Sequence, residues 1–112
     1  MSRITSHVLD TSKGKPAWGV GIILYEQIAN EWFQIAKGIT NKEGRLLNLL
    51  QEEEELTPGI YKMTFDIKHY FNSDDIKTFF PVVEVIIEVE TIGHYHIPLL
   101  ISPFGYSTYK GC

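Results

Sequence analysis

Hydrophobic and polar residues alternate along two segments of the chain, which is the pattern of strands that bury one face. In residues 59–68, GIYKMTFDIK, every second residue from Tyr61 to Ile67 is apolar and the residues between them are polar. Residues 81–90, PVVEVIIEVE, repeat the pattern, with apolar residues alternating mainly with glutamates. Because each segment has one apolar face, both are predicted to be strands of antiparallel sheets.

Shorter segments with weaker alternation are predicted to form six further strands. They cover residues 5–9, 18–25, 32–39, 45–50, 94–101 and 106–109. Stretches rich in Gly, Pro, Ser and Asn separate them. Many short strands at this spacing are typical of a β-sandwich or a barrel.

One short helix is predicted at residues 73–79, where Ser73 is a suitable N-cap and two aspartates fall in the first turn. The acidic run at residues 52–55 is predicted to be a solvated loop or strand end.

Length and composition limit the classes of protein that remain. The 112 residues are enough for one domain with its own hydrophobic core, so residues 1–112 are predicted to be a single domain. A net charge of −4 argues against nucleic acid or an anionic membrane surface as a partner. No apolar run approaches the roughly 18 residues that cross a bilayer, and the N-terminal segment lacks the apolar region of a signal peptide. The single cysteine, Cys112, excludes an intrachain disulfide, and a cytoplasmic location is expected.

Histidines are the main candidates for chemistry. His94 and His96 are two residues apart on a predicted strand and therefore share one face, while His7 lies on another strand and Arg45 begins a third. Such histidines are often plain polar residues of a strand edge. They also suit a general base near neutral pH, or a catalytic zinc held by three histidines. Spacing alone does not separate these interpretations, but a serine hydrolase is disfavoured because the chain has no Gly-x-Ser-x-Gly motif.

Two long segments resemble the signatures of the transthyretin-like family. They are residues 6–17, SHVLDTSKGKPA, and residues 94–112, HYHIPLLISPFGYSTYKGC. Between them, NKEGR at 41–45 and LTPGIY at 56–61 occur in the expected order. The similarity runs from about residue 4 to the C-terminus. It implies an all-β, transthyretin-like (prealbumin-like) fold, a two-sheet antiparallel β-sandwich with one short helix.

The family comprises hormone carriers and 5-hydroxyisourate hydrolases, and this chain resembles the hydrolases. That branch has a His in the first motif, an Arg after the middle Gly turn, a His-x-His pair and a closing Tyr-Arg-Gly-Ser. The corresponding positions are His7, Arg45, the pair His94 and His96, and the tetrapeptide YKGC at 109–112. The resemblance implies hydrolysis of 5-hydroxyisourate to 2-oxo-4-hydroxy-4-carboxy-5-ureidoimidazoline, a step of urate degradation in purine metabolism. The alternative is a non-enzymatic carrier of a small aromatic ligand.

The resemblance also implies roles for single residues. His7 and His96 would activate water and move protons, and Arg45 would bind the oxygens of the substrate ring. His7, Arg45, Tyr109 and Cys112 would contact the substrate. These roles require no metal and no cofactor.

Two positions depart from the hydrolase pattern. Lys110 replaces an arginine and so lacks the planar fork of a guanidinium, and Cys112 replaces a serine hydroxyl with a thiol. His94 is left as a supporting candidate and His69 as a surface residue. The resemblance further implies a homotetramer, a dimer of dimers, with active sites in the channel between dimers.

Overall fold

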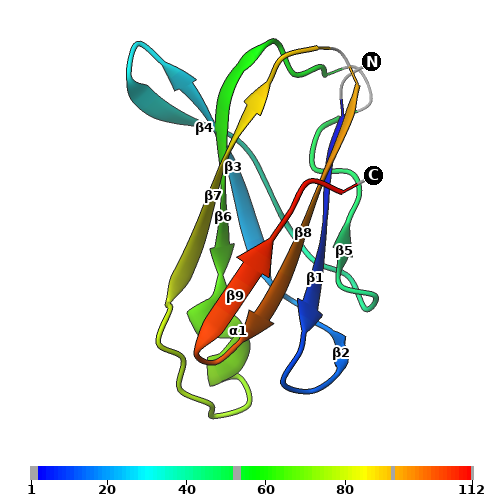
Figure 1. Ribbon diagram of the computed structural model, residues 1–112, viewed down its shortest axis with the longest axis vertical. Coiled ribbons are helices and arrows are strands. Elements are labelled where there is room, and N and C mark those ends of the chain that lie inside the picture. Colours follow the sequence, from blue (N-terminus) through cyan, green and yellow to red (C-terminus); the bar gives the residue numbers. More distant parts are fainter. Residues whose placement is uncertain (1–2, 52–53, 92, 112) are drawn as a thin grey trace.

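Two β-sheets face each other in the computed structural model, which describes residues 3–51, 54–91 and 93–111 (Figure 1). The first sheet has the order β2-β1-β8-β9, with β5 also paired to β1, and the second has the order β4-β3-β6-β7. The elements are β1 (Arg3–Asp10), β2 (Lys15–Pro16), β3 (Gly21–Ile28), β4 (Glu31–Ile39), β5 (Arg45–Leu46), β6 (Gly59–Asp66), α1 (Ile67–Asn72), β7 (Val82–Val89), β8 (His94–Ser102) and β9 (Gly105–Thr108).

The predicted two-sheet sandwich with one short helix is confirmed, with one difference in strand direction. All strand pairs are antiparallel except β1 and β8, which run parallel from Arg3 opposite His94 to Asp10 opposite Ile101. This pair joins the two sequence segments that carry the family resemblance. It therefore places His7 and the pair His94 and His96, from opposite ends of the chain, on neighbouring strands.

The core lies between the sheets and follows the alternation of the sequence. In β6, Tyr61, Met63 and Phe65 are at most 1% exposed, and in β7 Val83 and Val89 are equally buried. The first sheet contributes buried side chains from β1 and β8 to the same core, namely Ile4, Val8, Ile97, Leu99 and Ile101. Because inward residues alternate with outward ones, the opposite face of each sheet points away from this core.

The predicted helix at 73–79 was wrong, and the predicted strand at 59–68 was two residues too long. The helix spans Ile67–Asn72, and its N-cap is Asp66, whose carboxylate accepts a hydrogen bond from the His69 N–H at 3.1 Å. Ser73 lies at the C-terminal end instead. Ile67 continues the strand alternation, but with Tyr70 and Phe71 it also forms an i, i+3, i+4 row, and all three are buried. Burial of these three side chains favours the helix over a continued strand.

Other element boundaries also moved. The strand predicted at 45–50 is limited to Arg45–Leu46, the one predicted at 18–25 begins at Gly21, and β2 was not predicted. In the acidic run, residues 52 and 53 lie outside the described residues, and Glu54 and Glu55 are exposed and outside any strand. Within the described ranges, no helix is both long and apolar enough to cross a membrane. The cytoplasmic location stays a prediction.

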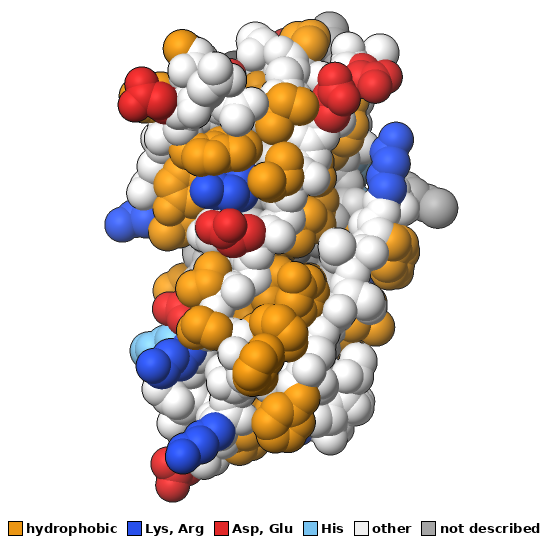
Figure 2. Space-filling model, turned by 60° about the vertical axis from the view of Figure 1, so that its left-hand side comes forward, with side chains coloured by type: hydrophobic (Ala, Val, Ile, Leu, Met, Phe, Trp, Pro, Cys, Tyr) orange, Lys and Arg blue, Asp and Glu red, His pale blue; other side chains and the backbone are white. Residues whose placement is uncertain are grey.

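The outward face of the second sheet is rich in hydrophobic side chains. Figure 2, which brings the left side of Figure 1 forward, shows them gathered around a few charged groups. Ile39, Val82 and Ile86 are exposed there, and Lys62 forms an ion pair with Glu84 at 3.6 Å. His7, His94 and His96 lie on strands of the first sheet and not on this face.

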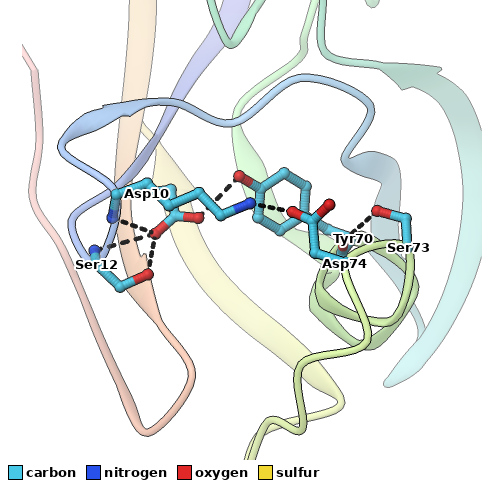
Figure 3. A network of polar contacts seen from close by, with 6 residues as sticks. Asp10, Ser12, Tyr70, Ser73 and Asp74 are labelled. Atoms are coloured by element: carbon cyan, nitrogen blue, oxygen red, sulfur yellow. Dashed lines mark hydrogen bonds and ion pairs between the residues drawn. The ribbon is translucent and has the colours of Figure 1, made fainter.

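Asp10 is the last residue of β1, and its carboxylate is buried on the core side of the sheet. Asp10 is 0% exposed and accepts hydrogen bonds from the Tyr70 hydroxyl at 2.8 Å and from the Ser12 N–H and hydroxyl at 3.0 and 2.5 Å (Figure 3). Lys13 contributes its backbone N–H and pairs its ammonium with Asp74. Burial and the bond to Asp10 raise the pKa of the Tyr70 hydroxyl. The network ties the turn after β1 to α1.

Candidate active site

His7 and Arg45 lie directly opposite each other on paired strands. The antiparallel register of β1 and β5 matches His7 with Arg45 and Ser6 with Leu46. Ser6 and Leu46 are buried, so strand alternation turns the other pair outward, away from the core. The imidazole and the guanidinium thus share the open face of the first sheet.

A tight turn before Arg45 produces this placement. The Asn41 side-chain oxygen accepts hydrogen bonds from the backbone N–H groups of Glu43 at 3.0 Å and Arg45 at 2.9 Å. Gly44 has a φ of +74°, and a Cβ there would lie 2.3 Å from the backbone oxygen of Val8. Only glycine fits so close to β1 in this conformation. The sequence Asn-Lys-Glu-Gly-Arg therefore encodes the position of the arginine.

His96 joins the same face from β8. The parallel register places it opposite Thr5, two residues before His7 on β1. Thr5 Oγ1 is 2.8 Å from His96 Nδ1 and 2.8 Å from His94 Nε2. Because Nδ1 of His96 is bonded to Thr5, its Nε2 is the nitrogen that remains for a water molecule or a substrate.

The protonation state of His7 follows from its partner. Its Nε2 is 2.9 Å from the backbone oxygen of Glu43. A carbonyl only accepts, so Nε2 carries the proton and Nδ1 keeps a lone pair. Burial and then the Arg45 cation lower the pKa of His7, and the Glu43 carbonyl partly offsets this.

His96 has a similar electrostatic environment. Burial lowers its pKa first, followed by repulsion from the Arg45 cation and from His94 and His7 when these are protonated. At neutral pH the face therefore presents two uncharged imidazoles next to a guanidinium. Such a set can remove a proton from water and stabilise a developing oxyanion.

The C-terminal tail packs against His96. The Gly111 N–H donates to the His96 backbone oxygen at 2.8 Å, and a Cβ on Gly111 would lie 2.6 Å from His96 Cδ2. Tyr109 is 61% exposed and lines, with His96, a groove of about 350 Å³ that runs along β7. The Lys110 ammonium lies 5.8 Å from the centre of the Tyr95 ring. Cys112 lies outside the described residues.

The described residues contain no group of three His, Cys, Asp or Glu side chains placed to hold a metal ion. Ring nitrogens of His94 and His96 are instead bonded to the hydroxyl of Thr5.

Residues 4–111 match the HIUase/Transthyretin family. The chain belongs to this family. A 5-hydroxyisourate hydrolase of Salmonella dublin is 41% identical over 109 residues, which cover 96% of this chain and 79% of the relative.

Solved structures of the HIUase/Transthyretin family have the same fold. Sea bream transthyretin, solved in complex with thyroxine, has a TM-score of 0.91 and 34% identity, covering 97% of this chain and 94% of that one. The 5-hydroxyisourate hydrolase of Klebsiella pneumoniae has a TM-score of 0.86 and 30% identity, covering 98% and 99%. A transthyretin and a hydrolase thus share this sandwich, so the fold alone does not assign the function.

For this family member, the structure places His7, Arg45 and His96 on one sheet face, as the family resemblance implies, while their roles stay predictions. Tyr109 lies at the groove beside His96, and His69 is exposed on α1.

Sequence reasoning missed two residues, Thr5 and Gly111. Thr5 could have been found from the sequence, because it is two residues before His7 on a predicted strand and must therefore lie on the same sheet face as His7. Gly111 had a weaker one, as the glycine of the closing tetrapeptide.

Proposed function

We propose that this chain is a 5-hydroxyisourate hydrolase acting in urate degradation. The observation that carries the proposal is the grouping of His7, His96 and Arg45 on one open sheet face, where burial and Arg45 lower the pKa of both histidines. The relatives named as 5-hydroxyisourate hydrolases support the same conclusion.

The reaction requires a base, an oxyanion site and a proton donor. A water molecule gives a proton to His7 Nδ1 or His96 Nε2, and its oxygen bonds to a ring carbonyl carbon. Arg45 stabilises the negative charge on the carbonyl oxygen with its N–H donors. The adjacent C–N bond then breaks, and the leaving nitrogen takes a proton from the protonated imidazole. Water has been added across one C–N bond, and both histidines return to their starting charge.

The carrier alternative has less support. The sandwich itself does not distinguish the branches, since a transthyretin and a hydrolase match it about equally. A face with a guanidinium and two imidazoles is costly to cover with an apolar aromatic ligand, because each polar group loses water. The same groups are directly useful for hydrolysis.

We further propose that the working form is a homotetramer, a dimer of dimers. In the part of the chain that the structure describes, His7 and Arg45 do not line the groove beside His96, so they stand on an open surface. A neighbouring subunit facing this sheet would close the site and exclude water, which strengthens its electrostatics. Size-exclusion chromatography with light scattering tests this. A monomer with full activity would contradict it.

Turnover is tested with substrate that is generated in situ in the assay mixture. Urate oxidase generates 5-hydroxyisourate from urate, and its ultraviolet absorbance is followed with and without the purified protein. We expect decay well above the spontaneous rate, unchanged by a strong chelator. Decay at the spontaneous rate would exclude hydrolase activity and favour the carrier.

A further inference from the structure

The Thr5 hydroxyl lies between two imidazole rings. Thr5 is 6% exposed, and its Oγ1 is 2.8 Å from both His94 Nε2 and His96 Nδ1. The rings come from β8 and the hydroxyl from β1, so the parallel strand pair builds the contact. Little water reaches this oxygen to compete with either ring.

A hydroxyl has one hydrogen, so it donates to one ring and must accept from the other. In one arrangement His96 Nδ1–H donates to Thr5, and Thr5 donates to His94 Nε2. His96 then presents a bare Nε2, which is a base. In the other arrangement His94 Nε2–H donates to Thr5, and Thr5 donates to His96 Nδ1. His96 then presents Nε2–H, which is an acid.

We propose that Thr5 and His94 are positioning residues that set which nitrogen of His96 carries the proton. The proposal rests on the hydrolase function above and deepens it. When His96 Nε2 takes a proton from water, its Nδ1 proton passes to Thr5 and the Thr5 proton passes to His94 Nε2. The exposed His94 then releases its Nδ1 proton to solvent. The reverse sequence lets His96 Nε2 protonate the leaving nitrogen, and each ring ends every step with one proton.

The groups around His96 disfavour a positive charge on its ring, which favours transfer of the proton to His94. His96 faces Arg45 from β5, His7 from β1 and His94 from its own strand, and all three oppose a positive charge on its ring. Passing the charge outward to His94 relieves that repulsion. The Thr5 hydroxyl is the described group that is bonded to both rings.

Thr5→Val and Thr5→Ser form a matched pair for the first test. Valine keeps the branched shape and removes the hydroxyl, whereas serine keeps the hydroxyl. We expect Thr5→Val to lower kcat about tenfold or more with KM within about twofold, the scale seen when a partner that orients a functional histidine is lost. Thr5→Ser should stay within about threefold of the parent. His94→Gln, which keeps a polar group near Thr5 but cannot relay a proton, should resemble Thr5→Val.

Nitrogen NMR of protein labelled with 15N-histidine reads the tautomer directly and does not depend on turnover. We expect His96 to be protonated on Nδ1 in the parent and in Thr5→Ser, and to change to the Nε2–H form in Thr5→Val. Thermal melting confirms that Thr5→Val is folded. The same tautomer and the same kcat in all three proteins would overturn the relay. A tautomer that depends on Thr5 in a parent without turnover would overturn the hydrolase proposal alone.

Discussion

β1 supplies two polar clusters that face opposite sides of the first sheet. On the core side, Asp10 is completely buried, and both of its carboxylate oxygens accept hydrogen bonds (Figure 3). On the open side, His7 and Arg45 are partly or fully exposed, and His7 Nδ1 keeps an unused lone pair. The two clusters begin three residues apart on one strand.

The difference shows what each cluster is built for. A buried carboxylate is tolerated only when its acceptor sites are filled, so the Asp10 cluster is saturated and has nothing left to offer a substrate. The open cluster keeps a lone pair and guanidinium donors available. Leaving these groups without a protein partner costs little free energy at a surface, because water can bind them. We expect changes to the first cluster to affect stability, and changes to the second to affect turnover.

The largest effect is expected from Asp10→Ala. The substitution leaves the Tyr70 hydroxyl and the Ser12 N–H and hydroxyl without their acceptor, which should lower the free energy of unfolding by about 3 kcal/mol or more. Urea denaturation measures it, with the exposed Glu55→Ala as control. Equal midpoints for the two variants would show that the buried network does not stabilise the fold.

Substitutions of His7 and Arg45 in the open cluster, and of His96 on the same face, should lower turnover and leave stability nearly unchanged. His7→Ala, His96→Ala and Arg45→Ala should each lower kcat/KM about a hundredfold or more, the usual scale for losing a general base or an oxyanion donor. Their unfolding midpoints should stay close to that of the parent. His69→Ala, on the exposed side of α1, is the control. A comparable loss in His69→Ala would mean that the wrong histidines have been assigned.

A smaller effect is expected from pH. Turnover needs uncharged His7 and His96, and burial together with Arg45 lowers the pKa of both. The acidic limb of the kcat/KM profile should therefore have its midpoint below the usual histidine value of about 6.5. In Arg45→Met the NMR titration midpoints of both rings should rise, because the nearby positive charge that penalises protonation is gone. A midpoint above 6.5 in the parent would contradict this account of the site.

The smallest effect is expected from Lys110→Arg, which restores the family residue. The Lys110 ammonium lies over the Tyr95 ring, so the exchanged charge is held by an aromatic face that binds either cation. Activity should stay within about threefold, measured by the same decay assay. A gain of tenfold or more would show that the guanidinium fork contacts the substrate.

The sequence alone determined the features that depend on neighbours in the chain. The alternation in β6 and β7 requires one buried face, and the segment Asn-Lys-Glu-Gly predicts a turn just before Arg45. The family motifs likewise predicted the grouping of His7, Arg45 and His96. The alternation can be read locally because strand geometry turns spacing into direction, whereas the grouping of the three side chains was implied by the family resemblance.

Only the tertiary structure decided the rest. Ile67 suits both a strand and a helix, and burial with Tyr70 and Phe71 selected the helix. The contact of Thr5 with His96 joins residues 91 positions apart, through a parallel pairing that no local pattern encodes. Such a contact exists only when the whole sandwich has formed, because the sheet core holds β1 against β8 and thereby sets the hydroxyl between the two rings.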